Sequence, residues 1–191
     1  MPISYTNRKG NTYCLCQGTT QTGKPRYFFA REPKGEAMDS VPEGYRIEES
    51  VNGVVSLVKE RPRLIASNET AAVQAALKGH PKPGNYRLAI KGNQIVVYER
   101  RGPDAEALSA IFADYGPIPQ SALDGLDRSS QYAPILRFVL HDSDRREFTA
   151  ERWCFLGSVD DWISTGHSGQ IEALARALIP LLGTDGFFDL Y

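Results

Sequence analysis

The sequence has little cysteine and no long apolar run. Its three cysteines are Cys14, Cys16 and Cys154. An odd number of cysteines is typical of free thiols and argues against a disulfide framework. No apolar run approaches the roughly 18 residues that a membrane-spanning helix needs, and the opening stretch MPISYTNRKGNTYCLC has no apolar signal segment. We therefore expect a cytoplasmic protein that does not enter a membrane.

The motifs that mark common enzymes are also missing from the sequence. It contains no G-x-S-x-G, no H-E-x-x-H, no G-x-x-x-x-G-K-[ST] and no G-x-G-x-x-G after a strand. Thr22-Gly23-Lys24 resembles the end of a phosphate loop, but it lacks the upstream glycine and no helix is expected after it. The Cys14/Cys16 pair has no second pair to complete a zinc site. These absences favour a non-enzymatic protein without a cofactor or a bound metal.

Lysine is absent after Lys91, and the charge is distributed unevenly along the chain. Residues 1–101 hold 16 Lys and Arg against 9 Asp and Glu, a net charge of +7. Residues 102–191 hold 6 Arg against 14 Asp and Glu, a net charge of −8. The sequence thus predicts a basic part (1–101) and an acidic part (102–191) that pack together as one compact unit. This distribution has two interpretations. The basic part binds a polyanion, or the two parts neutralise each other's charge within one molecule or between two copies.

Apolar residues make up 41% of the chain and charged residues 24%, as in an ordinary folded domain. Three hairpins are expected in the first part, over 12–32, 44–60 and 85–100. The second hairpin contains Asn52-Gly53, the strongest short signal for a type I′ turn. Both faces of its second strand are apolar, so we expect that strand to lie inside a sheet. A helix is expected over 67–80, with Ser67 or Asn68 as its cap.

The acidic part opens with a predicted helix over 104–116, followed by a polar loop over 116–131. Residues 133–142 and 147–158 predict two strands, with Leu136, Phe138 and Leu140 buried. A helix over 169–183 has a buried stripe formed by Ile171, Leu174, Ala175 and Leu178, and the tail GFFDLY is apolar enough to pack against the fold. The expected class is α+β, with antiparallel hairpins forming sheet and about three helices packed on it.

The first hairpin is the main candidate for a binding surface. Cationic and aromatic side chains alternate along it, which suits phosphate neutralisation and base stacking. A sheet face built of rings is equally typical of a core. The candidate residues for binding nucleic acid or a protein partner are Arg8, Lys9, Lys24, Arg26, Tyr27, Phe29 and Arg31.

Two further segments admit a functional interpretation beside a structural one. Asp142, Asp144, Glu147 and Glu151 are candidate ligands for a metal-assisted phosphodiester hydrolase, although Asp142-Ser143-Asp144 is also typical of a polar turn. Asp160-Asp161 suits a loop or a helix N-terminus. The stretch ERWCFLGSVDDW (151–162) is favoured as core, with an acidic and aromatic contact surface as the alternative.

Several stretches resemble small uncharacterised bacterial proteins: YTNRKGNTYCLCQGTTQTGKPRYFF, VPEGYRI and ERWCFLGSVDDW. This resemblance covers most of the chain and implies no catalytic residue. The first hairpin, over about forty residues, is also similar to the three-stranded DNA-binding sheets of integrase arm domains, without a diagnostic motif.

The leading hypothesis is a non-enzymatic binding module whose basic sheet face engages nucleic acid or an acidic protein. The alternatives are the hydrolase and a self-associating structural protein whose oppositely charged parts pair between subunits.

Overall fold

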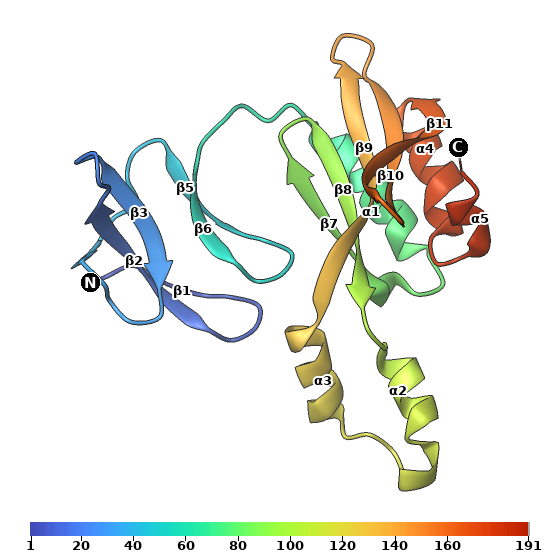
Figure 1. Cartoon of the computed structure of the whole chain (residues 1–191), viewed down its shortest axis with the longest axis horizontal. Helices are drawn as coiled ribbons and strands as arrows, with labels where there is room; N and C mark the ends of the chain where they lie inside the picture. Colours follow the sequence, from blue (N-terminus) through green and yellow to red (C-terminus); the bar gives the residue numbers. More distant parts are fainter. Residues whose placement is uncertain (191) are drawn as a thin grey trace. The chain divides into compact units, whose positions relative to one another are not determined.

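The computed structural model describes residues 1–190 and shows an α+β protein built from antiparallel sheets and helices (Figure 1). The chain forms two compact units. Unit 1 comprises Met1–Pro62 with Ala105–Gln131, and unit 2 comprises Arg63–Asp104 with the chain from Tyr132 onward. Each unit therefore takes segments from both the basic part (1–101) and the acidic part (102–191).

Unit 1 contains two small antiparallel sheets. The first has the order β1-β2-β3, with β4 paired to β2, and the second is the β5–β6 hairpin, whose strand β6 contacts β3. The expected position of β6 inside a larger sheet is wrong, since β6 pairs with β5 alone in the described chain. The strands are β1 Ser4–Thr6, β2 Thr12–Thr19, β3 Pro25–Ala30, β4 Glu36–Ala37, β5 Tyr45–Glu49 and β6 Val55–Lys59.

The turn at Asn52-Gly53 forms a hairpin, but not of the expected type. Gly53 has a positive φ of 79°, and Asn52 is not in the left-handed region that a type I′ turn requires. The Gly53 amide donates to the Ser50 carbonyl at 2.9 Å, so the chain turns over Ser50–Gly53 and closes on a left-handed glycine. The side-chain amide of the buried Asn7 donates to the Gly53 carbonyl at 2.6 Å, which ties this turn to the β1–β2 connection.

Two helices complete unit 1: α2 Ala105–Ile111 and α3 Gln120–Ser129, with a short 3₁₀ turn at Ala113–Tyr115 between them. The expected polar loop over 116–131 is wrong for most of its length. Residues 105–129 are all described and include no buried side chain. The apolar signal of α3 is short: Leu123 and Leu126 are three residues apart and half-buried, and α3 has no other large apolar residue.

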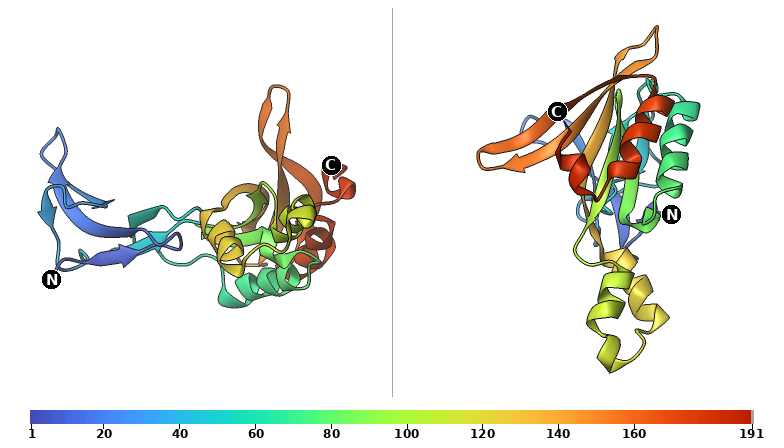
Figure 2. Two further views of the ribbon diagram at one scale, coloured as in Figure 1. Left: turned by 90° about the horizontal axis from the view of Figure 1, so that it is seen from below. Right: turned by 90° about the vertical axis from the view of Figure 1, so that its right-hand side faces the viewer.

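Unit 2 is a five-stranded antiparallel sheet with the order β11-β10-β9-β8-β7. The helices α1 and α4 lie side by side on one face of it (Figure 2). The elements are α1 Ser67–Lys78, β7 Tyr86–Lys91, β8 Gln94–Arg101, β9 Gln131–Asp142, β10 Glu147–Leu156, β11 Val159–Gly169, α4 Ile171–Leu178 and α5 Asp185–Phe188, with 3₁₀ turns at Pro83–Asn85 and Ile179–Leu181.

The core of unit 2 confirms the predicted alternation. Leu136, Phe138 and Leu140 are buried on β9, and the α4 stripe of Ile171, Leu174, Ala175 and Leu178 packs in the same cluster. The tail packs through the buried Phe187; Tyr191 lies outside the described residues. Strand β11 was not predicted, and Asp160-Asp161 lies within it rather than in a loop or at a helix N-terminus.

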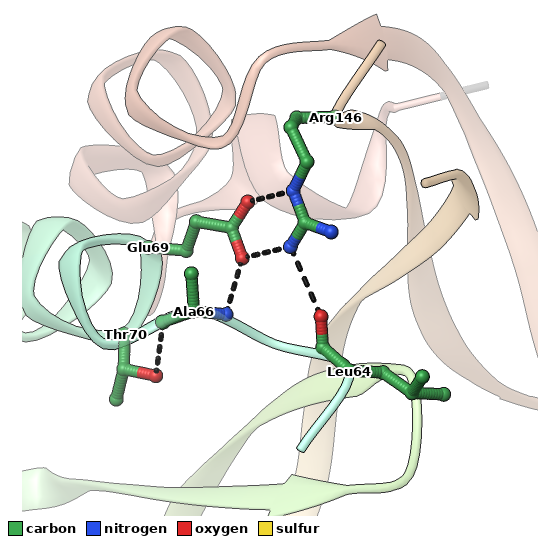
Figure 3. Close-up of polar contacts among 5 residues, drawn as sticks. All are labelled: Leu64, Ala66, Glu69, Thr70 and Arg146. Atoms are coloured by element: carbon green, nitrogen blue, oxygen red, sulfur yellow. Dashed lines mark hydrogen bonds and ion pairs between the residues drawn. The ribbon is translucent and has the colours of Figure 1, made fainter. Parts of the chain in front are cut away.

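The start of α1 is held by an ion pair to the β9–β10 turn (Figure 3). The Glu69 carboxylate accepts from the Ala66 amide at 2.7 Å and from Arg146 Nε at 2.8 Å. The guanidinium of Arg146 also donates to the Leu64 carbonyl at 3.0 Å. The residue before the helix is therefore Ala66, not Ser67 or Asn68 as expected, and Glu69 caps its amide.

Among the described residues, no helix is both long enough and apolar enough to cross a bilayer.

Candidate functional site

The tip of the β2–β3 hairpin exposes a lysine. The turn is closed by the Thr20 amide donating to the Lys24 carbonyl at 2.9 Å and by the Gly23 amide donating to the Thr20 carbonyl at 2.9 Å. Gly23 has a φ of 77°, a conformation that glycine adopts without strain. Lys24 is exposed on this turn, and Pro25 starts β3 next to it, where its missing N–H is tolerated.

The three rings of β3 lie on opposite faces, as alternation requires. The exposed Arg26 places its guanidinium carbon 6.0 Å from the centre of the Phe28 ring on one face. On the other face the Tyr27 ring meets the Tyr45 ring edge-on at 5.6 Å. Tyr27, Phe28 and Phe29 are each half-buried, so neither face is closed to solvent.

Arg8 has a structural environment. Its guanidinium donates to the carbonyls of Val51 at 2.8 Å, Asp127 at 3.2 Å and Ser130 at 2.6 Å, and a further bond reaches the Arg128 carbonyl at 3.3 Å. These bonds satisfy carbonyl groups at the C-terminal end of α3, which have no partner within the helix. Arg8 therefore joins the β1–β2 connection to α3 within unit 1.

The remaining candidates differ in exposure. Lys9 is half-buried, with its aliphatic stem beside Gly53. Arg31 is exposed just after β3 and donates to the Asn11 side-chain oxygen at 3.4 Å. Since a strand rises about 3.3 Å per residue, Arg31 lies roughly 17 Å from Arg26 along the strand. The structure thus brings Lys24 and Arg26 together at one end of the hairpin and leaves Arg31 at the other.

The charge around this hairpin is a local feature. Residues 1–31 contain five Lys and Arg and no Asp or Glu. Unit 1 as a whole holds 10 basic and 11 acidic residues, and unit 2 holds 12 of each. The imbalance between the sequence halves therefore disappears within each unit, whereas the hairpin remains basic.

The acidic residues at 142–151 are dispersed among separate partners. Asp142 Oδ1 accepts from the backbone amides of Asp144 and Arg145, both at 2.9 Å, which is a polar turn. Glu147 lies 3.7 Å from His141 Nε2, and Glu151 pairs with Arg137. Within residues 1–190 no three His, Cys, Asp or Glu side chains are grouped so that they could hold a metal ion.

A part-buried polar cluster of unit 2 is built around Tyr86. Its hydroxyl donates to Glu99 at 3.2 Å. Burial raises the pKa of Tyr86, with a further rise from the Glu99 charge, and burial also raises the pKa of Glu99. The neighbouring His80 ring accepts from the Lys82 amide at Nδ1 and lies 3.1 Å from the Leu182 carbonyl at Nε2. Those contacts assign the ring proton to Nε2 and leave neither nitrogen available as a general base.

A second aromatic surface lies on the face of unit 2 opposite the helices. Because the sequence favoured residues 151–162 as core, this surface was not predicted. Trp153 and Trp162 meet edge-on, with ring centres 5.1 Å apart. Arg137, paired with Glu151, lies 4.4 Å above the Trp162 ring. The alternation along β10 was visible in the sequence: Arg152 and Cys154 are buried, whereas Trp153 between them is half-buried. Trp162, on the neighbouring strand β11, is also half-buried.

Comparison with known proteins assigns this chain to no family. No family model matches the chain, and neither does any curated protein or solved structure. The two resemblances drawn from the sequence remain expectations. The function is therefore argued from the exposed residues themselves, and the best-defined charged surface is the Lys24/Arg26 end of the β2–β3 hairpin.

Proposed function

We propose that this protein is a non-enzymatic binding module and that its β2–β3 hairpin engages the phosphate backbone of a nucleic acid. The observation that carries the proposal is the exposed Lys24/Arg26 end, which lies beside half-buried rings in a segment without acidic residues. The same proposal places the protein in the cytoplasm, because its cysteines are free thiols and suit a reducing compartment.

The chemistry favours a single strand over a duplex. Lysine and arginine neutralise phosphates irrespective of sequence, and an exposed ring edge or face can stack an unpaired base for about 1–3 kcal/mol. Arg26 is held near the Phe28 ring, so a phosphate contact and a stacking contact are available side by side. Arg8 is excluded from this role by its bonds to backbone carbonyls, so the proposal rests on Lys24, Arg26 and Arg31.

The test is fluorescence anisotropy of the full chain with labelled single-stranded DNA, single-stranded RNA and duplex DNA. Three phosphate contacts predict a slope of about −2 for log K against log salt on a single strand, a loss of roughly 20-fold between 50 and 200 mM. The Lys24→Ala/Arg26→Ala variant should bind at least tenfold more weakly at low salt and reduce the slope to about −0.7.

A matched control removes the same charge from elsewhere. Lys78 and Arg176 are exposed on α1 and α4, in unit 2. The Lys78→Ala/Arg176→Ala variant should retain the wild-type affinity and slope. Equal losses in the two variants would show a non-specific charge effect, and negligible binding by the wild type at low salt would refute the proposal.

A further inference from the structure

The connection between α2 and α3 exposes large apolar side chains. Ile111 is 64% exposed, Phe112 45% and Tyr115 87%. The rings of Phe112 and Tyr115 meet edge-on at 6.2 Å. Neighbouring apolar residues on a surface of this kind are typical of protein contact sites.

A shallow hollow adjoins these side chains. It opens where the chain turns from α2 toward α3, and small and apolar residues line it. The lining residues are Ser109, Ala113, Gly116, Pro117 and Ile118. We call residues 105–131, which carry the exposed apolar side chains and this hollow, the acidic tip, for the charge described next.

The charge around the acidic tip is negative. Residues 105–131 hold four Asp and Glu and one Arg, a net charge of −3. Asp114 is exposed within the tip, and Asp124 is exposed on α3, where its carboxylate accepts from the Gln120 side chain at 3.0 Å. An apolar surface with an acidic surround fits a partner that is basic and carries apolar side chains.

We propose that the acidic tip docks the basic β2–β3 hairpin of a second copy of this chain. The hairpin has the complementary properties: exposed Lys24 and Arg26, rings that are half-exposed on both faces, and no acidic residue before Glu32. Contact between two acidic tips would place net charges of −3 opposite each other, and an anionic membrane surface would repel the tip in the same way. The tip is exposed in the single chain, so the hairpin of the same molecule does not cover it.

This contact joins different surfaces of the two copies. When the hairpin of each copy meets the tip of the other, the contact closes as a two-fold dimer; when each pair of copies makes only one such contact, it builds rings or chains whose size grows with concentration. The inference shares the hairpin with the proposed function but does not depend on nucleic-acid binding. If both hold, a nucleic acid competes with the tip and disperses the assemblies.

The test is sedimentation velocity of the full chain with complementary charge-reversed variants. The Lys24→Glu/Arg26→Glu variant makes the hairpin acidic, and the Asp114→Lys/Asp124→Lys variant makes the tip basic. Each variant alone should sediment as a monomer at concentrations where the wild type associates. An equal mixture should associate again, because each altered surface then finds its complement on the other variant.

Three outcomes would overturn the inference. The wild type could remain a monomer at about 200 µM and low salt, a concentration at which even a weak contact produces measurable association. The hairpin variant could associate as strongly as the wild type, which would indicate contact between tips. The mixture could remain monomeric although both variants are folded by circular dichroism. A Tyr115→Ser variant separates the two proposals: it should weaken self-association at least fivefold and leave single-strand affinity unchanged.

Discussion

Replacing Arg146 by methionine should destabilise unit 2 through the carboxylate of Glu69. The Glu69 side chain is only 5% exposed, whereas that of Arg146 is 36% exposed. In the variant the carboxylate keeps one hydrogen bond, from the Ala66 amide. A buried charge that loses its partner costs far more than the net value of the pair itself.

The expected magnitude follows from burial. Removing one partner of a fully buried pair costs about 3–5 kcal/mol. Because more than a third of Arg146 is exposed, solvent screening reduces the expected loss to about 2 kcal/mol, or roughly 10 °C in the Tm of a unit of this size. Arg146 has a positive φ of 56°, and methionine experiences the same backbone strain, so the change isolates the side chain.

The effect should depend on pH in a defined direction. Burial alone would raise the pKa of Glu69, but the hydrogen bonds from Arg146 and the Ala66 amide and the Arg146 charge outweigh it and lower that pKa. A lowered pKa in the folded state stabilises the fold above the ordinary value of about 4.3, and this stabilisation disappears as the pH falls through the folded value. The difference between wild type and Arg146→Met should be full at pH 7 and should shrink steadily below about pH 4.

Urea unfolding followed by tryptophan fluorescence measures this difference. Both tryptophans of the chain, Trp153 and Trp162, lie in unit 2, so their signal reports that unit. Arg145→Met is the matched control, since Arg145 is the exposed neighbour in the same turn, and it should change the free energy of unfolding by less than about 0.5 kcal/mol. Equal losses in the two variants, or a loss that is the same at pH 7 and pH 3.5, would refute the reasoning.

Three further predictions concern single residues. Arg8→Met should destabilise unit 1 by about 1–3 kcal/mol, because carbonyl groups in part-buried hydrogen bonds lose a charged donor; hydrogen exchange should quicken in α3, and unchanged protection there would contradict the role of Arg8. Gly183→Ala should cost about 1–2 kcal/mol in urea unfolding, because its φ is 74° and the added methyl would lie 3.1 Å from the Tyr86 hydroxyl; Gly186→Ala, with only an ordinary contact, is the control. Burial raises the pKa of Glu99, so the neutral carboxyl stabilises the fold at low pH, and this stabilisation is lost as the pH rises through the raised pKa. Glu99→Gln should therefore be more stable than wild type at pH 7.5 and equal to it at pH 4 in urea unfolding. Equal stability of the two proteins at both pH values would contradict the raised pKa.

Local patterns predicted the elements that bury a regular apolar face. Leu136, Phe138 and Leu140 alternate on β9, and the α4 residues recur at helical spacing, so their burial followed from the sequence. Two elements escaped for the opposite reason. Helix α3 offers only the half-buried Leu123 and Leu126 and has no buried residue among those described. Strand β11 carries the exposed Asp160 and Asp161 near its start and is a strand because β10 pairs with it.

The candidate surface was only partly accessible to sequence reasoning. Alternation separated Arg26 and Phe28 from Tyr27 and Phe29, and the Gly23-Lys24 turn placed a lysine at the hairpin tip. The sequence could not distinguish Arg8 from those cations, because its partners Asp127 and Ser130 lie more than 100 residues away along the chain. The contact between Arg137 and Trp162 is likewise set by strand pairing, not by spacing.

By itself, the sequence determined the α+β class, the hairpins and the buried stripes, because these depend on periodicities of two and 3.6 residues within short windows. The tertiary structure alone decided which segments share a unit, and with that where the charges balance. Residues 105–131 join unit 1 although they interrupt unit 2 in the chain. The partners of Arg8, Glu69 and Arg137 are distant in sequence, and no local pattern encodes a contact that exists only after the chain has folded.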